Sequence, residues 1–169
     1  AAAAVACILK NGVILGKNVV ILAGTGPVGG RAAVIMAKLG AKVCISSRGM
    51  QRSEQACNYL NQRFGVEIEP REAKTNENRA KLIENAQIVL ATGAAGVELL
   101  SEDDWRNNSS IEIMVDANAV PPAGIKGIKM TDKGESRHGK TTWGSIGFGP
   151  AKLALQRQCI GRLFEQNDL

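Results

Sequence analysis

The stretch NVVILAGTGPVGGRAAVIMAKLGAKVCISSR, residues 18–48, decides the fold. It opens with a continuous apolar run, residues 19–23, which predicts a strand that is buried on both faces. The glycine pattern Gly24-x-Gly26-x-x-Gly29 follows, and then come a helix-like segment and a second apolar run that ends at residues 46–48. A strand, a glycine-rich turn, a helix and a second strand, in this order, make up the βαβ unit that binds dinucleotides.

Each glycine of this turn has an expected role. Gly24 permits the tight turn, Gly26 lets the backbone approach a pyrophosphate, and Gly29 lets helix and strand pack closely. The N–H groups that open the helix then face the diphosphate, and Pro27 suits the first helical turn because no donor is needed there. The alternative is a structural turn that binds no ligand. The predicted pyrophosphate site comprises Gly24, Thr25, Gly26, Pro27, Val28 and Gly29.

The end of the second predicted strand indicates which dinucleotide binds. NAD-preferring domains usually place Asp or Glu there, about 20 residues after the first glycine, where the acid bonds the ribose 2′-OH. This chain has Ser46, Ser47 and Arg48 at that place. No acid appears before Glu54, and Arg52 lies one turn further on. Because a guanidinium and hydroxyls bind a 2′-phosphate that a carboxylate would repel, we predict NADP as the cofactor. A solvated surface role for the first arginine is the alternative.

Strands alternate with helices along the rest of the chain, which predicts a Rossmann-like, doubly wound α/β fold with a mostly parallel sheet flanked by helices. Residues 131–140 are predicted to form a polar loop, and the only histidine, His138, is expected to be a solvated residue of that loop. Predicted helices cover residues 1–10, 27–39, 52–64, 76–84 and 151–164, and predicted strands cover residues 19–23, 43–46, 66–68, 87–91 and 111–115.

Further site residues follow from the position of strand ends. Ligands of such sheets bind beyond the carboxyl ends of the strands. Thr92, Gly93 and Ala94 come after the fourth predicted strand, and Asn118 comes after the fifth. We therefore expect these residues to face the ribose and nicotinamide of the cofactor; the alternative is that they are ordinary turn residues.

Composition bounds the remaining function classes. The 169 residues predict one domain, 1–169, with a single core. No apolar run approaches the ~20 residues of a membrane span, and the Ala-rich start has no basic leader, so we expect a cytoplasmic protein that does not bind membranes. The net charge of +5 is spread along the chain without a Lys/Arg cluster, which argues against nucleic-acid binding. The four cysteines form no CxxC pair, so we expect reduced thiols and no metal site.

The whole chain resembles the C-terminal, NADP-binding part of the methylene-tetrahydromethanopterin/methylene-tetrahydrofolate dehydrogenases of methylotrophic bacteria. The most specific match is DANAVPPAGIKGI at residues 116–128. The resemblance implies an NADP-dependent oxidoreductase of one-carbon metabolism. Such an enzyme moves a hydride from the methylene carbon of methylene-tetrahydromethanopterin, or its tetrahydrofolate analogue, to NADP+ and leaves the methenyl form. The matching stretches are residues 22–33, 63–73, 91–105, 109–128, 131–134 and 150–165.

The same resemblance implies partners and one more site residue. Lys152 matches the family's lysine in the glycine-rich stretch before the last helix, which makes it a candidate catalytic residue in the pterin site; a surface lysine is the alternative. The helices at 1–12 and 150–169 match those that link this domain to a smaller N-terminal domain. The family also implies a homo-oligomer, with a trimer as the named form.

Two other functions stay open at this point. One is a shikimate-dehydrogenase-like NADP domain, against which the match over residues 91–128 argues. The other is a stand-alone NADP-binding module without catalysis. Short-chain dehydrogenases are disfavoured, because the only tyrosine, Tyr59, is followed four residues on by Arg63 and so lacks the Tyr-x-x-x-Lys pair.

Overall fold

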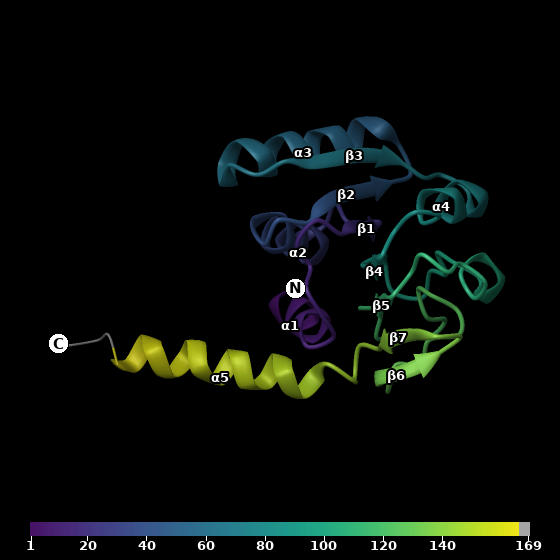
Figure 1. Cartoon of the computed structure of the whole chain (residues 1–169). Coiled ribbons are helices and arrows are strands. Elements are labelled where there is room, and N and C mark those ends of the chain that lie inside the picture. The colour runs from purple at the N-terminus through teal and green to yellow at the C-terminus, as the bar shows by residue number, and fades with distance from the viewer. Residues whose placement is uncertain (166–169) are drawn as a thin grey trace.

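A seven-stranded sheet forms the middle of the domain (Figure 1). The computed structural model describes residues 1–165, apart from the side chains at positions 163 and 165, so residues 166–169 of the predicted last helix lie outside the described residues. The strands are β1 (Asn18–Leu22), β2 (Lys42–Ser47), β3 (Ile68–Glu72), β4 (Ile88–Ala91), β5 (Ile113–Asp116), β6 (Lys133–Arg137) and β7 (Lys140–Trp143). Their order is β3-β2-β1-β4-β5-β7-β6, and within the described part of the chain only the β6–β7 pair is antiparallel.

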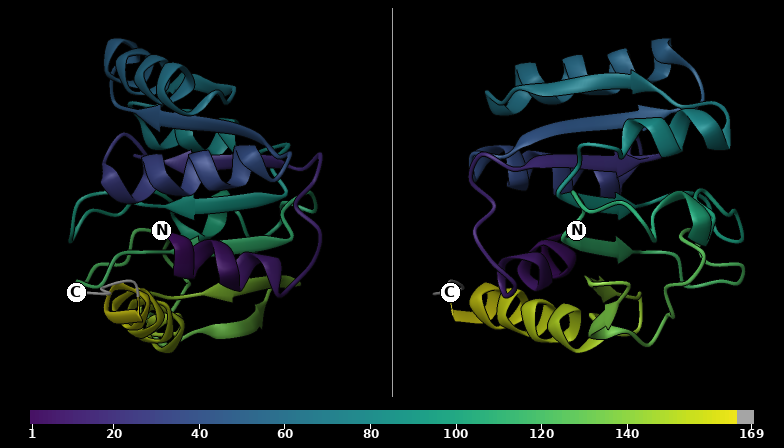
Figure 2. Two further views of the ribbon diagram at one scale, coloured as in Figure 1. Left: turned by 90° about the vertical axis from the view of Figure 1, so that its left-hand side faces the viewer. Right: turned by 45° about the vertical axis from the view of Figure 1, so that its right-hand side comes forward.

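Helices and loops cover both faces of this sheet (Figure 2). The first strand shows why: Val19 and Ile21 pack into one buried cluster, whereas Val20 and Leu22 pack into a second cluster on the opposite face. The predicted doubly wound, mostly parallel fold is therefore confirmed. The helices are α1 (Ala2–Leu9), α2 (Pro27–Lys38), α3 (Met50–Phe64), α4 (Asn76–Leu82), the 3-10 turn η1 (Glu102–Asp104) and α5 (Gly149–Glu165).

The third strand is not where the sequence predicts it. The expected strand at 66–68 lies instead at Ile68–Glu72, paired in parallel with β2 from Val43↔Ile68 to Ser47↔Glu72. This segment is mostly polar and contains Pro70, so no apolar pattern marks it. A proline is tolerated because β3 is an edge strand of the sheet, where one side makes no ladder hydrogen bonds.

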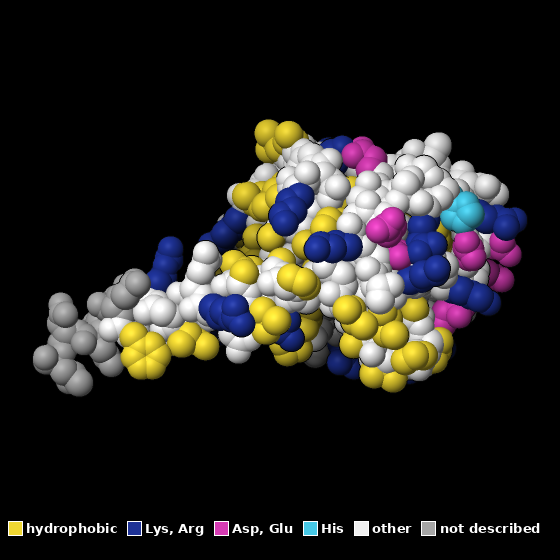
Figure 3. Space-filling model, turned by 90° about the horizontal axis from the view of Figure 1, so that it is seen from below, with side chains coloured by type: hydrophobic (Ala, Val, Ile, Leu, Met, Phe, Trp, Pro, Cys, Tyr) yellow, Lys and Arg dark blue, Asp and Glu magenta, His cyan; other side chains and the backbone are white. Residues whose placement is uncertain are grey.

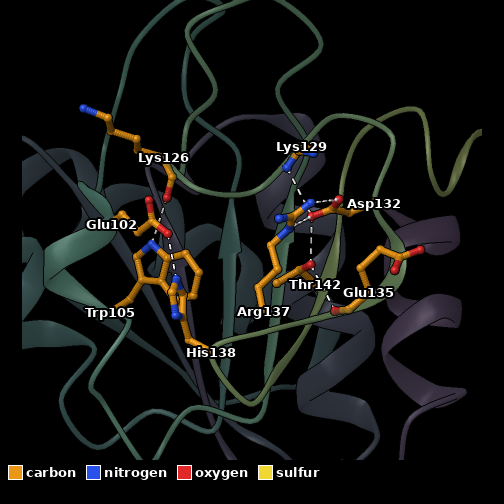
Figure 4. Close-up of polar contacts among 9 residues, drawn as sticks. All are labelled: Glu102, Trp105, Lys126, Lys129, Asp132, Glu135, Arg137, His138 and Thr142. Carbon is orange, nitrogen blue, oxygen red and sulfur yellow. Dashed lines mark hydrogen bonds and ion pairs between the residues drawn. The ribbon is translucent and has the colours of Figure 1, made fainter.

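The prediction of a polar loop at 131–140 is also wrong, because most of these residues form the β6–β7 hairpin. Asp132, only 2% exposed, accepts bonds from Arg137 Nε at 2.5 Å, from Arg137 Nη2 at 2.6 Å and from Thr142 Oγ1 at 2.8 Å (Figure 4). Charge-assisted bonds therefore take part in holding this hairpin together. Its strands carry no alternation of apolar and polar residues, so the sequence pattern does not predict them.

His138 lies exposed in the turn of this hairpin with φ 49°, as the sequence predicts, and its ring also makes two side-chain contacts. Its Nε2 is 2.7 Å from Glu102 Oε1, and its ring meets the buried Trp105 edge-on at 5.4 Å between centroids (Figure 4). The hydrogen bond from His138 lowers the pKa of Glu102. His138 thus ties the hairpin to η1, at the amino end of β7.

The first and last helices lie side by side. α1 packs on α5 and α2, and α5 then runs on past the sheet (Figure 1). Seen from below, apolar side chains lie along this projecting helix (Figure 3), on which Leu153, Ile160 and Phe164 are exposed. A linking role for both helices stays a prediction. None of the helices described within residues 1–165 is long and apolar enough to cross a membrane.

Candidate functional site

A cavity of about 410 Å³ opens at the carboxyl ends of β1, β2 and β4. Two larger hollows, of about 660 and 600 Å³, lie elsewhere: one at the amino ends of β1 and β2, the other between α4 and residues 104–110. The smaller cavity occupies the edge at which ligands of doubly wound sheets bind. The predicted site residues that line it are Thr25, Gly26, Ser46, Ser47, Arg48, Arg52, Thr92, Gly93 and Ala94.

The glycine loop forms one wall of this cavity. A Cβ added to Gly29 would lie 2.4 Å from the carbonyl oxygen of Gly24, so only glycine lets α2 approach the turn this closely. A Cβ on Gly26 would meet nothing within 4 Å, which leaves open space above its backbone. Gly24 is required at the turn because a Cβ there would lie 2.6 Å from Ile21 Cγ2. The left-handed residue of the turn is Ala23, with φ 52°.

The first turn of α2 presents backbone donors at this wall. Gly26 is the N-cap and Pro27 is at the start of the helix, and no side chain of the described residues caps it. Val28, in the same turn, is half exposed. Uncapped N–H groups and the positive end of the helix dipole favour an anion at this position. Together with the open space above Gly26, this arrangement fits a diphosphate.

The two serines at the end of β2 are buried and already hydrogen-bonded. Ser46 Oγ accepts a bond from the N–H of Ala23 at 3.4 Å. Ser47 Oγ donates to the carbonyl of Gly49 at 2.7 Å and lies 2.9 Å from Ser53 Oγ. These bonds shape the turn that carries Arg48. Direct binding of a 2′-phosphate by either hydroxyl stays a prediction.

Arginines give the cavity its charge. Arg48 is exposed at its rim, and Arg52, in the first turn of α3, donates from Nε to Thr25 Oγ1 at 3.1 Å. A third arginine, Arg79 of α4, lines the cavity although sequence reasoning does not single it out. Among the described residues that line the wall, Glu98 is the only acid. Three guanidinium groups against one carboxylate favour an anionic ligand.

The residues that follow β4 and β5 differ in their placement. Thr92 extends the ladder to β1 by donating its N–H to the carbonyl of Leu22 at 3.1 Å, and it lines the cavity. Asn118 does not line this cavity: its N–H donates to Asp116 Oδ1 at 2.9 Å and its Nδ2 to the carbonyl of Pro122 at 3.2 Å. Burial raises the pKa of Asp116 against the opposing effect of backbone N–H donors. A cofactor contact of Asn118 stays a prediction.

Lys152 also lies outside the cavity. It is exposed in the first turns of α5, and its backbone N–H donates to the carbonyl of Phe148 at 3.1 Å. α5 follows β7, and the carboxyl end of β7 is at the same edge of the sheet as the cavity, because β7 runs parallel to β5. The role of Lys152 stays a prediction.

Comparison with known proteins gives a family and two curated relatives. The family described as "Alanine dehydrogenase/PNT, C-terminal domain" matches residues 4–139. The bifunctional protein MdtA of Methylorubrum extorquens AM1 is 44% identical over 99% of this chain, which spans 59% of that protein. The NAD(P)-dependent methylenetetrahydromethanopterin dehydrogenase of the same strain is 37% identical over 67% of the chain and 38% of its own length. The resemblance predicted from the sequence is therefore confirmed.

A solved structure supports the fold. An L-alanine dehydrogenase superimposes with a TM-score of 0.61 over 98% of this chain and 53% of its own, at 20% identity. At this identity the likeness bears on the fold alone.

Proposed function

The chain belongs to the alanine dehydrogenase/PNT C-terminal domain family, and we propose that it is the NADP-binding part of a methylene-tetrahydropterin dehydrogenase. The observation that carries the proposal is the single cavity wall in which an open glycine turn, the uncapped start of α2 and the arginines at positions 48 and 52 stand together. Diphosphate and 2′-phosphate are both anionic, so one dinucleotide satisfies both groups of donors.

The choice of NADP over NAD rests on the end of β2. Ser46, Ser47 and Arg48 occupy the place where NAD-preferring domains carry an acid. Arg48 is exposed at the cavity rim, and the buried serines hold the turn that presents it. A guanidinium there makes hydrogen bonds with a 2′-phosphate in which both partners are charged, whereas a free ribose hydroxyl offers it only a neutral acceptor.

The proposed reaction removes a hydride from the methylene carbon that bridges two nitrogens of the reduced pterin. When bound, NADP+ supplies the hydride acceptor. The nitrogen lone pairs stabilise the cation that remains, so no side chain has to take a proton. The chain's own residues then act by binding and orientation: the glycine loop fixes the diphosphate, and the β2 turn fixes the ribose end.

The one-carbon carrier is tetrahydromethanopterin or tetrahydrofolate in this proposal. The relatives' names support it, since one of them is a methylenetetrahydromethanopterin dehydrogenase. Lys152 is the proposed contact of the chain with the pterin, at the start of α5. The proposal also includes α1 and α5 as links to a smaller N-terminal domain, a homo-oligomeric, trimeric assembly, and a cytoplasmic location. A shikimate-dehydrogenase-like domain and a non-catalytic module have no comparable support.

A spectrophotometric assay tests the activity. Protein that carries this chain is mixed with methylene-tetrahydromethanopterin or methylene-tetrahydrofolate, and with NADP+ or NAD+, and reduced cofactor is followed by its absorbance. Formation of NADPH with one of the two carriers is the expected result. A protein that binds NADP+ yet reduces it with neither carrier refutes the proposed reaction.

A further inference from the structure

Arg79 lines the cavity from α4, beside the loops that follow β3 and β4. It is half-buried on α4, and its Nε donates to the carbonyl of Leu99 while its Nη1 donates to the carbonyl of Lys74 at 3.2 Å. One carbonyl belongs to the loop after β4 and the other to the loop after β3. Both loops flank the cavity, so these two bonds fix the plane of the guanidinium between them.

The support of Arg79 is itself anchored. Thr75 caps α4 by accepting a bond from the N–H of Asn78 at 3.2 Å. Asn76 Nδ2 donates to Asp104 Oδ2 at 2.8 Å, and the same carboxylate accepts the N–H of Ser101 at 2.7 Å. α4 is thus tied to the segment after β4 at two points. A guanidinium held on such a support is pre-organised for a ligand.

The cavity-lining residues of the two loops that Arg79 bonds are apolar, except for Thr92, Gly93 and the exposed Glu98. Ala73 and Leu99 are buried, and Val97 is half exposed. The cavity wall therefore has two chemically different parts: one has the glycine loop with Arg48 and Arg52, and the other has a planar cation beside apolar side chains and one exposed carboxylate. A flat heterocycle suits the second part, because guanidinium planes stack on π-systems and apolar side chains cover their faces.

From this geometry we propose that Arg79 is a binding residue for the adenine ring of the dinucleotide, and that it acts independently of the 2′-phosphate. The inference rests on the proposed function. The Arg79 guanidinium, immobilised by the carbonyls of Leu99 and Lys74, provides one stacking surface. The apolar wall provides the rest. Arg79 consequently sets the affinity for any adenine nucleotide, whereas Arg48 sets the preference between NADP and NAD.

The test compares three ligands and four variants by calorimetric titration: NADP+, NAD+ and 5′-AMP, each with the wild-type chain, Arg79→Ala, Arg79→Lys, Arg48→Ala and Lys81→Ala. Lys81 is the matched control, since it is an exposed cation on the same helix outside the cavity. Arg79→Ala is expected to weaken all three ligands by a similar factor, about tenfold, as expected for the loss of base stacking. Arg79→Lys keeps the charge but not the plane, so it is expected to lose nearly as much.

Each other result is decisive. If Arg79→Ala loses affinity for NADP+ alone, Arg79 is a phosphate contact and the inference is overturned. The inference is also overturned if Arg79→Lys binds all three ligands as tightly as the wild type. Equal binding by Arg79→Ala and wild type overturns the inference while the proposed function stands. A wild-type chain that binds no dinucleotide overturns the proposed function and the inference with it. Thermal unfolding of each variant without ligand shows whether a lost affinity reflects a lost fold.

Discussion

Replacing Gly29 by alanine is expected to separate the two roles of the glycine loop. The added Cβ would lie 2.4 Å from the carbonyl oxygen and 2.5 Å from the Cα of Gly24, about 1 Å less than the 3.4 Å at which ordinary contact begins. Both neighbouring atoms are backbone, so no rotamer change relieves the clash and α2 has to move away from β1. Overpacking of this kind costs about 1–3 kcal/mol, and we expect the upper end.

Gly26→Ala is the matched control, three residues earlier in the same loop. A Cβ there meets nothing within 4 Å, and the backbone, at φ −82° and ψ 176°, is open to alanine. Alanine is a poorer N-cap than glycine, but it also restricts the unfolded chain, so the net change in stability stays within about 1 kcal/mol. The methyl group occupies the space proposed for the diphosphate. NADP+ binding is therefore expected to fall at least tenfold.

Two measurements decide between these effects. Thermal unfolding without ligand is expected to show a Tm about 6–12 °C lower for Gly29→Ala, at about 2–4 °C per kcal/mol, and little change for Gly26→Ala. Calorimetric titration with NADP+ is expected to show weakened binding for both. The reasoning is refuted if Gly26→Ala melts as early as Gly29→Ala, or if Gly26→Ala binds NADP+ like the wild type.

Three more outcomes are expected. Arg48→Ala weakens NADP+ binding by about 1.5–3 kcal/mol, far more than NAD+ binding, in calorimetry, because one charge-assisted contact to the 2′-phosphate is lost; equal losses for both cofactors contradict this. Burial opposes ionisation of Asp132, yet bonds from Arg137 and Thr142 hold its pKa below the ordinary value. The ionised carboxylate therefore stabilises the fold fully above about pH 3.9, and this contribution disappears as the pH falls through the lowered pKa. Asp132→Asn should therefore cost about 1.5–3 kcal/mol at neutral pH and flatten the acid limb in urea unfolding, and an unchanged acid limb argues against the pair. Gly147→Ala would place a Cβ 1.7 Å from the carbonyl oxygen of Asp132, so urea unfolding should show a loss of about 3 kcal/mol or more, whereas Gly161→Ala, with nothing within 4 Å, should not destabilise the fold.

The sequence predicts the part of the fold that apolar runs and glycine spacing dictate. β1 and β4 are apolar on both faces, so the sequence pattern predicts these two strands. Gly65 ends α3 in the left-handed conformation, so the end of this helix is also predicted. β3 and the β6–β7 hairpin do not follow from the local pattern. Pro70 is tolerated because β3 is an edge strand, and the buried Asp132 depends on bonds from Arg137, Thr142 and the N–H of Lys129. Such contacts depend on the tertiary structure and cannot be predicted from local sequence.

The candidate site divides in the same way. Gly26 and Arg48 can be placed from spacing alone, since the βαβ unit fixes where the first turn and the end of the second strand meet. Arg79 cannot, because its position in the cavity depends on how α4 docks on the loop after β4. The hydrogen bond from the Ser47 hydroxyl to the carbonyl of Gly49 also cannot be predicted from the sequence. A serine at the end of a strand is equally consistent with a ligand contact and with a turn-forming residue.

Calorimetric titration of the wild-type chain with NADP+ and with NAD+, without any pterin, tests the central claim most directly. The account predicts that NADP+ binds tightly to the site formed by the glycine loop and Arg48, and that NAD+ binds much more weakly. Equal affinity for the two cofactors would contradict the assignment of Arg48 to the 2′-phosphate. Binding of neither would contradict the claim that this cavity is a dinucleotide site.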